Sequence, residues 1–89
     1  MRVFFKISGI VQGIGYRWFV VGAAAKFALT GLVRNRPDGT VEGEAQGEKT
    51  GIEAFLKELR TGHPEAEVAN AETTRMEERK GEKDFTIAH

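Results

Sequence analysis

The chain has 89 residues, 40% of them hydrophobic, and 13 basic against 13 acidic side chains, which predicts one globular domain over residues 1–89. The absence of cysteine excludes disulfides, thiolate nucleophiles and thiolate metal sites, and the zero net charge disfavours nucleic-acid binding, which usually needs a basic excess. No apolar run is long enough to cross a bilayer and no signal-peptide pattern follows Met1, so we expect a cytoplasmic protein.

The first part of the chain predicts a strand, a glycine turn and a helix. Residues 2–10 place apolar side chains at every second position and are rich in β-formers, which predicts a strand. Gly13 and Gly15 mark a turn. Residues 18–29 predict a helix that is apolar around most of its circumference, so we expect it to lie across a sheet. Gly22 costs this helix about 1 kcal/mol relative to alanine, which predicts a close packing contact there.

The middle of the chain predicts a hairpin followed by a second helix. Residues 30–47 contain two β-like arms separated by Pro37-Asp38-Gly39, a strong turn sequence. Thr50-Gly51-Ile52-Glu53 matches a capping box with Thr50 as the N-cap. The apolar side chains that follow have helical spacing, so we predict an amphipathic helix over residues 51–60.

The last third of the chain predicts two further strands. Gly62 and Pro64 end the second helix, residues 66–76 form a strand, a charged turn follows, and residues 85–88 form a short final strand. The order β-α-β-β-α-β, with one extra short strand, is that of the α+β ferredoxin-like split βαβ sandwich, an antiparallel sheet with two helices on one face. This topology carries many functions, so the function must come from particular residues.

The segment from Val11 to Arg17, Val-Gln-Gly-Ile-Gly-Tyr-Arg, predicts a phosphate-binding loop. Its two glycines allow the backbone to approach an anion closely, and the backbone N–H groups at a helix N-terminus attract negative charge. A cation beside a helix N-terminus is disfavoured by the helix dipole, so Arg17 makes better sense if an anion binds between it and the amides. Its planar guanidinium can hold that anion with two parallel hydrogen bonds. We expect Gln12 to be a solvated side chain.

Other candidate residues are weaker when taken alone. Asn35 is more simply a turn-side asparagine, and the alternative is an amide that orients a water molecule and stabilises a transition state. Aromatic residues like those near the turn more often pack in the core or line a site than form a surface on which nucleic-acid bases stack. His63 and His89 are isolated in the sequence, so we predict no metal site.

Three segments together resemble the acylphosphatase family. They are Gly9–Arg17, Gly31–Asn35 and Pro37–Glu42, at the family's spacing and in a chain of its length. The resemblance implies hydrolysis of the carboxyl–phosphate bond of acyl phosphates without a metal or other cofactor.

The resemblance also implies the roles of individual residues. Arg17 matches the family's phosphate-binding arginine and Asn35 matches its water-positioning asparagine. The backbone N–H groups that match the family's phosphate loop belong to Gln12, Gly13, Ile14, Gly15, Tyr16 and Arg17. The departures are Ile10, where the family often has a basic residue, and Ile14 and Tyr16, which stand for the usual valine and phenylalanine.

Several alternatives remain open at this stage. One alternative is a regulatory module that binds phosphate or acyl phosphate without turnover, and another is an RNA-binding ferredoxin-like domain, which the neutral charge and the absent aromatic motif disfavour. The chain also resembles the acylphosphatase-like domain of the carbamoyltransferases that mature hydrogenases. Asn35 beside Arg17 favours the enzyme, because a binding module needs only the loop. We rank the carbamoyltransferase low because the chain ends where such a protein would continue. We therefore expect a monomer with an acyl phosphate substrate, inorganic phosphate as product, and no nucleic-acid or membrane partner.

Overall fold

The computed structural model describes all residues from 1 to 89 and contains two helices and five strands in the predicted order. In chain order the elements are β1 (Arg2–Ile10), α1 (Tyr16–Lys26), β2 (Thr30–Asn35), β3 (Val41–Gln46), α2 (Lys49–Thr61), β4 (Glu67–Met76) and β5 (Phe85–Ile87). Neither helix has the length and apolar character needed to span a membrane.

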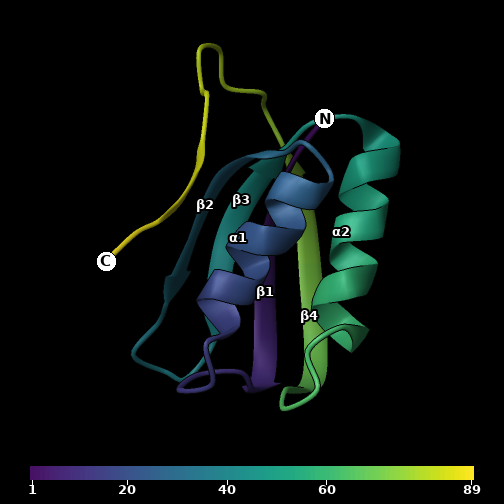
Figure 1. Ribbon diagram of the computed structural model, residues 1–89. Helices are drawn as coiled ribbons and strands as arrows, with labels where there is room; N and C mark the ends of the chain where they lie inside the picture. Colours follow the sequence, from purple (N-terminus) through teal and green to yellow (C-terminus); the bar gives the residue numbers. More distant parts are fainter.

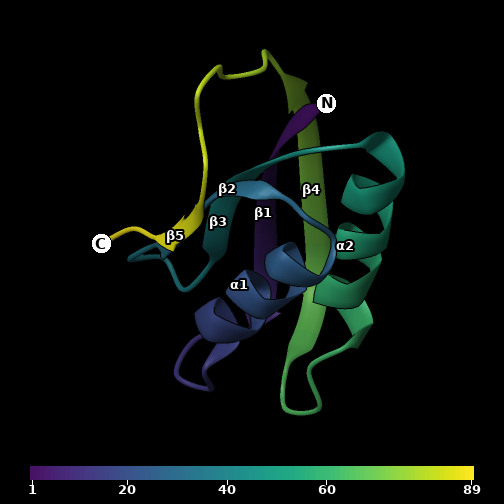
Figure 2. The same ribbon diagram turned by 45° about the horizontal axis from the view of Figure 1, so that its top comes forward.

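The strands form one sheet in the order β4-β1-β3-β2-β5, and both helices pack on the same face of it (Figures 1 and 2). Neighbours among the first four strands run antiparallel, which confirms the expected ferredoxin-like α+β arrangement. The extra strand β5 pairs with β2 in parallel, so the sheet is mixed and the expectation of a purely antiparallel sheet is corrected at this edge.

Alternation along β1 sets the inner face of the sheet. Val3, Phe5 and Ile7 are buried beneath the helices, as the period of two in a strand requires. The Phe5 ring meets the edge of Phe55 from α2 with ring centroids 5.5 Å apart, a favourable aromatic geometry. Gly43 of β3 lies directly under the Phe5 ring, where a Cβ would come within 2.6 Å of it. The core therefore fixes how α2 sits on the sheet.

The first helix differs from its prediction in two ways. It runs from Tyr16 to Lys26 and not from 18 to 29, because Gly15 in the left-handed conformation already starts it. Only one side of it is buried, and Trp18 on the other side is 73% exposed. The predicted close contact at Gly22 is wrong, since this residue is exposed and no atom lies within 4 Å of where its Cβ would be.

The second helix begins earlier than predicted, and its capping box is wrong. The N-cap is Glu48, whose backbone is extended and whose carbonyl accepts a hydrogen bond from the amide of Ile52 at 2.9 Å. Thr50 consequently lies inside the first turn, and no side chain caps the helix. The predicted apolar face is confirmed, with Ile52, Phe55 and Leu59 fully buried.

Four chain segments meet at one end of the sheet. The end of β1, the start of α1, the turn between β2 and β3, and the segment leading from α2 into β4 all lie there (Figure 1). The predicted phosphate loop joins the first two of these segments, so the other two are close enough to support it.

Candidate active site

The loop between β1 and α1 has the backbone that the sequence predicted. Gly13 and Gly15 have φ angles of 76° and 74°, in the left-handed region that favours glycine. No atom lies within 4 Å of where a Cβ would stand on either residue, so it is the backbone conformation and not crowding that calls for glycine.

The backbone N–H groups of this loop are free to bind a ligand. None from Gln12 to Arg17 donates a hydrogen bond to a protein acceptor. The first intrahelical bond of this turn runs from Phe19 to the carbonyl of Gly15. Unpaired amides at a helix N-terminus carry partial positive charge and attract anions.

Arg17 lies at the mouth of α1 and has no carboxylate partner among the ion pairs of the protein. Together with the loop it lines a cavity of about 80 Å³. The guanidinium and the helix N-terminus therefore add their positive charges at one place, and an anion there would relieve the repulsion between them.

Asn35, the last residue of β2, lines the same cavity as Arg17. Its Oδ1 atom is buried without a hydrogen-bond partner in the protein and is the one buried side-chain atom in that condition. Leaving such an acceptor unpaired costs about 1–3 kcal/mol, so its placement calls for a functional explanation. Arg17 and Asn35, 18 positions apart in sequence, are thus brought to one small cavity.

Most of the predicted loop residues line this cavity, but Ile14 does not. Those that do are Val11, Gln12, Gly13, Gly15, Tyr16 and Arg17, and Trp18 of α1 lines it as well. The Ile14 side chain packs against the hydrophobic core.

Gln12 corrects a sequence prediction. It was expected to be solvated, but its Nε2 donates hydrogen bonds to the carbonyls of Arg36, at 2.8 Å, and Thr40, at 2.9 Å. Both acceptors belong to the turn that follows Asn35. The turn is closed by Asp38, which accepts from the amide and hydroxyl of Thr40, and these bonds lower the pKa of its carboxyl group. Gln12 therefore fastens the phosphate loop to the segment that carries Asn35.

His63 contacts the predicted phosphate loop, although nothing in the sequence points to this contact. Its Nδ1 accepts a hydrogen bond from the amide of Glu65 at 3.1 Å, so the ring proton is on Nε2, which donates to the carbonyl of Ile14 at 3.1 Å. The ring also stands edge-on to Phe19, with centroids 5.3 Å apart. No local sequence pattern links residues 49 positions apart, and the sequence indicates only that Gly62 and Pro64 end the second helix.

Tyr16 supports the loop from the buried side, where it contacts α2. Its ring is 1% exposed, and its hydroxyl donates a hydrogen bond to the carbonyl of Leu59 near the end of α2. Burial raises the pKa of this hydroxyl well above its ordinary value, so it remains a donor at all physiological pH values. The bond ties the first residue of α1 to α2.

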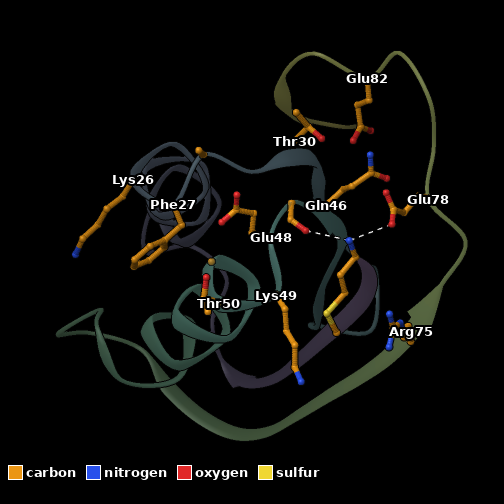
Figure 3. Close-up of a pocket in the computed structure, with 14 residues that line it drawn as sticks. Lys26, Phe27, Thr30, Gln46, Glu48, Lys49, Thr50, Arg75, Glu78 and Glu82 are labelled. Carbon is orange, nitrogen blue, oxygen red and sulfur yellow. Dashed lines mark hydrogen bonds and ion pairs between the residues drawn. The ribbon is translucent and has the colours of Figure 1, made fainter.

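A larger cavity, of about 1010 Å³, is lined by Met1 and residues near it (Figure 3), and the N-terminus lies at the end of the molecule opposite the β1–α1 loop (Figure 1). Here the Met1 amino group bridges the carbonyl of Gly47, at 3.0 Å, and the carboxylate of Glu78, at 3.2 Å. Its other charged side chains are mixed in sign, and none of the predicted site residues lines it. The chemistry indicated by the sequence therefore belongs to the smaller cavity.

Comparison with known proteins points to one family. The acylphosphatase family model matches residues 3–87. The chain is 41% identical to an acylphosphatase of Geobacillus thermodenitrificans over 88 residues, covering 99% of this chain and 94% of the relative. The crystal structure of acylphosphatase from Bacillus subtilis superposes with a TM-score of 0.94 at 33% identity, covering 99% of this chain and 98% of that one. Full-length HypF in its phosphate- and nucleotide-bound form has a TM-score of 0.84 at 34% identity, and the match covers 99% of this chain but 12% of HypF.

Proposed function

The chain belongs to the acylphosphatase family, as its sequence predicted, and from that premise we propose that it hydrolyses acyl phosphates at the cavity between Arg17 and Asn35. The products are a carboxylate and inorganic phosphate. The observation that carries the proposal is the unpaired, buried Oδ1 of Asn35 on the same small cavity as an arginine without a carboxylate partner. The family's enzymes are hydrolases, in agreement with the prediction of an enzyme.

The phosphate group of the substrate is held by backbone and side chain together. The free N–H groups from Gln12 to Arg17 donate to its oxygens, and the Arg17 guanidinium adds a bidentate contact. Because these donors are fixed by the glycine turn and by the helix, they need little reorganisation when charge moves onto the phosphate oxygens.

Asn35 positions the attacking water. Its Oδ1 accepts a hydrogen bond from one O–H of the water, which turns a lone pair of the water oxygen toward phosphorus. A carboxamide is not basic enough to remove the proton, so its contribution is orientation and electrostatic stabilisation. As the water oxygen bonds to phosphorus, the bond between phosphorus and the acyl oxygen breaks and its electron pair leaves with the carboxylate. The protons of the water remain with the phosphate product.

This reaction requires little acid–base help from the protein. A carboxylate is a good leaving group, so holding the anion and aiming the water supply most of the catalysis. The proposal uses no metal ion or organic cofactor, and the donor set of the cavity consists of amides, a guanidinium and a carboxamide.

The test is phosphate release from benzoyl phosphate, with and without a chelator. We expect turnover by the unmodified protein in both conditions and loss of phosphate binding in Arg17→Ala. Arg60→Ala is the matched control, because Arg60 is an exposed arginine on α2 without an ion pair. A protein that releases no phosphate from any acyl phosphate, or one whose turnover disappears with the chelator, would refute the proposal.

A further inference from the structure

An apolar groove adjoins the proposed phosphate site and is not used by it. It lies between α1 and β5, with Val21 on the helix side and Phe85 and Ile87 on the strand side, and has a volume of about 400 Å³. Arg17 and Trp18 line both the groove and the smaller cavity, so the two spaces share a wall. Grooves of this volume with mainly apolar walls are typical of small-molecule sites.

We infer that this groove receives the acyl group of the substrate and makes the enzyme selective for bulky apolar acyl phosphates, such as aromatic ones. The inference rests on the proposed function, because it is the position of the phosphate that places the acyl group. A phosphate held by Arg17 lies next to the groove, because Arg17 and Trp18 line both spaces.

The direction of attack agrees with this assignment. In an in-line displacement the nucleophile and the leaving group stand on opposite sides of phosphorus. Asn35, which positions the water, lines the smaller cavity but not the groove. The acyl oxygen therefore leaves on the side away from Asn35. The groove, which shares Arg17 and Trp18 with the cavity, is the apolar space available to the acyl group on that side.

The lining suits a leaving carboxylate with an apolar body. No aspartate or glutamate side chain lines the groove; its polar lining residues are Arg17, Thr86 and His89, and Arg17 also lines the phosphate site. Trp18 is 73% exposed, which is unusual for so large an apolar side chain. A flat acyl group lying against it would cover part of that surface and gain binding energy from it.

The first experiment compares kcat/KM for benzoyl phosphate and acetyl phosphate. We expect the unmodified protein to prefer benzoyl phosphate by about tenfold or more, the scale of burying one ring. Val21→Ser should reduce that preference about threefold to fivefold. Ala25→Ser is the matched control, because Ala25 is exposed one turn further along α1 and outside the groove, and it should keep the full preference. Thermal unfolding of both variants checks that they fold.

The second experiment measures binding without turnover. Trp18 is the one tryptophan of the chain, so its fluorescence reports ligands at the shared wall. We expect benzylphosphonate to bind more tightly than methylphosphonate, and Val21→Ser to narrow the difference. Equal affinities for the two phosphonates, or an unchanged benzoyl preference in folded Val21→Ser, would overturn the inference while leaving hydrolysis at the cavity intact. Tighter binding of benzylphosphonate by a protein that hydrolyses neither substrate would refute the proposed function and keep the groove.

Discussion

The imidazole of His63 donates a hydrogen bond to the carbonyl of Ile14, 3.1 Å away, and so joins the segment after α2 to the phosphate loop. In a trans peptide the carbonyl and the following N–H point in opposite directions. Holding the Ile14 carbonyl on the His63 side therefore directs the amide of Gly15 the other way. Because Gly13 and Gly15 allow this backbone to rotate easily, the hydrogen bond from His63 can fix the orientation of the Gly15 amide.

We predict that His63→Ala weakens phosphate binding more than it slows turnover. Loss of one hydrogen bond of about 0.5–1.5 kcal/mol corresponds to roughly a twofold to tenfold rise in KM and in the inhibition constant of inorganic phosphate. Steady-state kinetics with phosphate as a competitive inhibitor measures both constants. His63→Gln retains an N–H donor and should recover part of the affinity. If His63→Ala lowered only the melting temperature and left both constants unchanged, the contact would be merely structural.

Arg17 should be dispensable for folding and essential for binding. Because it has no carboxylate partner and stands at a helix N-terminus, its removal costs no ion pair and relieves a repulsion of about 0.3–1 kcal/mol. We expect Arg17→Ala to lose inhibition by phosphate while its melting temperature stays equal to or slightly above that of the parent. Arg17→Lys should remain strongly impaired, because a point charge lacks the planar fork. Full activity in Arg17→Lys would contradict the bidentate contact.

Asn35→Ala should lower activity without lowering stability. Removing the carboxamide that accepts a hydrogen bond from the attacking water and orients it is expected to lower kcat by about 10²–10³, the scale seen when one hydrogen-bonding group at a transition state is lost. Removing a buried acceptor without a protein partner is expected to leave the free energy of unfolding unchanged or to raise it, by up to about 1–3 kcal/mol. Measuring kcat and the free energy of unfolding in urea for the same variant tests both expectations. A folded Asn35→Ala that hydrolyses benzoyl phosphate at the parental rate would show that the water is positioned elsewhere.

The fold was predictable because local signals agreed with one another. Alternation in β1, the Pro37-Asp38-Gly39 turn and the apolar spacing of α2 each specify a different element, and together they leave one familiar topology. The helix starts were less predictable. Thr50 satisfies the pattern of an N-cap, but the extended backbone of Glu48 starts α2 two residues sooner, with Ile52 fully buried and no side-chain cap.

The chemistry of the site was predictable only where it is contiguous in sequence. Anion binding by the loop from Gln12 to Arg17 could be predicted from the sequence, because the conformation of its glycines and the free amides of the helix start are local properties. The proposed role of Asn35 is supported only by the tertiary structure, in which its unpaired oxygen is buried and the residue lines the same cavity as Arg17. The supports supplied by Gln12 and His63 depend on tertiary contacts across 24 to 49 positions, which no local pattern encodes.

A buried ion network anchors the strand that forms one wall of the groove. The Arg2 side chain, 1% exposed, donates to Glu44 of β3 at 2.7 Å and to Glu82, just before β5, at 2.8 Å. The hydrogen bond with Glu82 is the main cause that raises the pKa of Arg2, and the same bond lowers the pKa of Glu82. One side chain thus links the first strand, the sheet centre and the approach to β5.

This network predicts a loss of stability in acid. A carboxyl group whose pKa is lower in the folded than in the unfolded state stabilises the protein above the unfolded value, and that stabilisation disappears as pH falls through the folded value. For Glu82 the loss should therefore begin near its ordinary value of 4.5 and continue below it. Melting temperatures of the parent and of Glu82→Gln should differ most near pH 7 and converge in acid. Glu78→Gln is the control, because Glu78 is 66% exposed and its partner is the terminal amine, so its effect should be smaller. A difference between parent and Glu82→Gln that stayed constant from pH 7 to pH 3 would show that the pair with Arg2 does not carry the linkage.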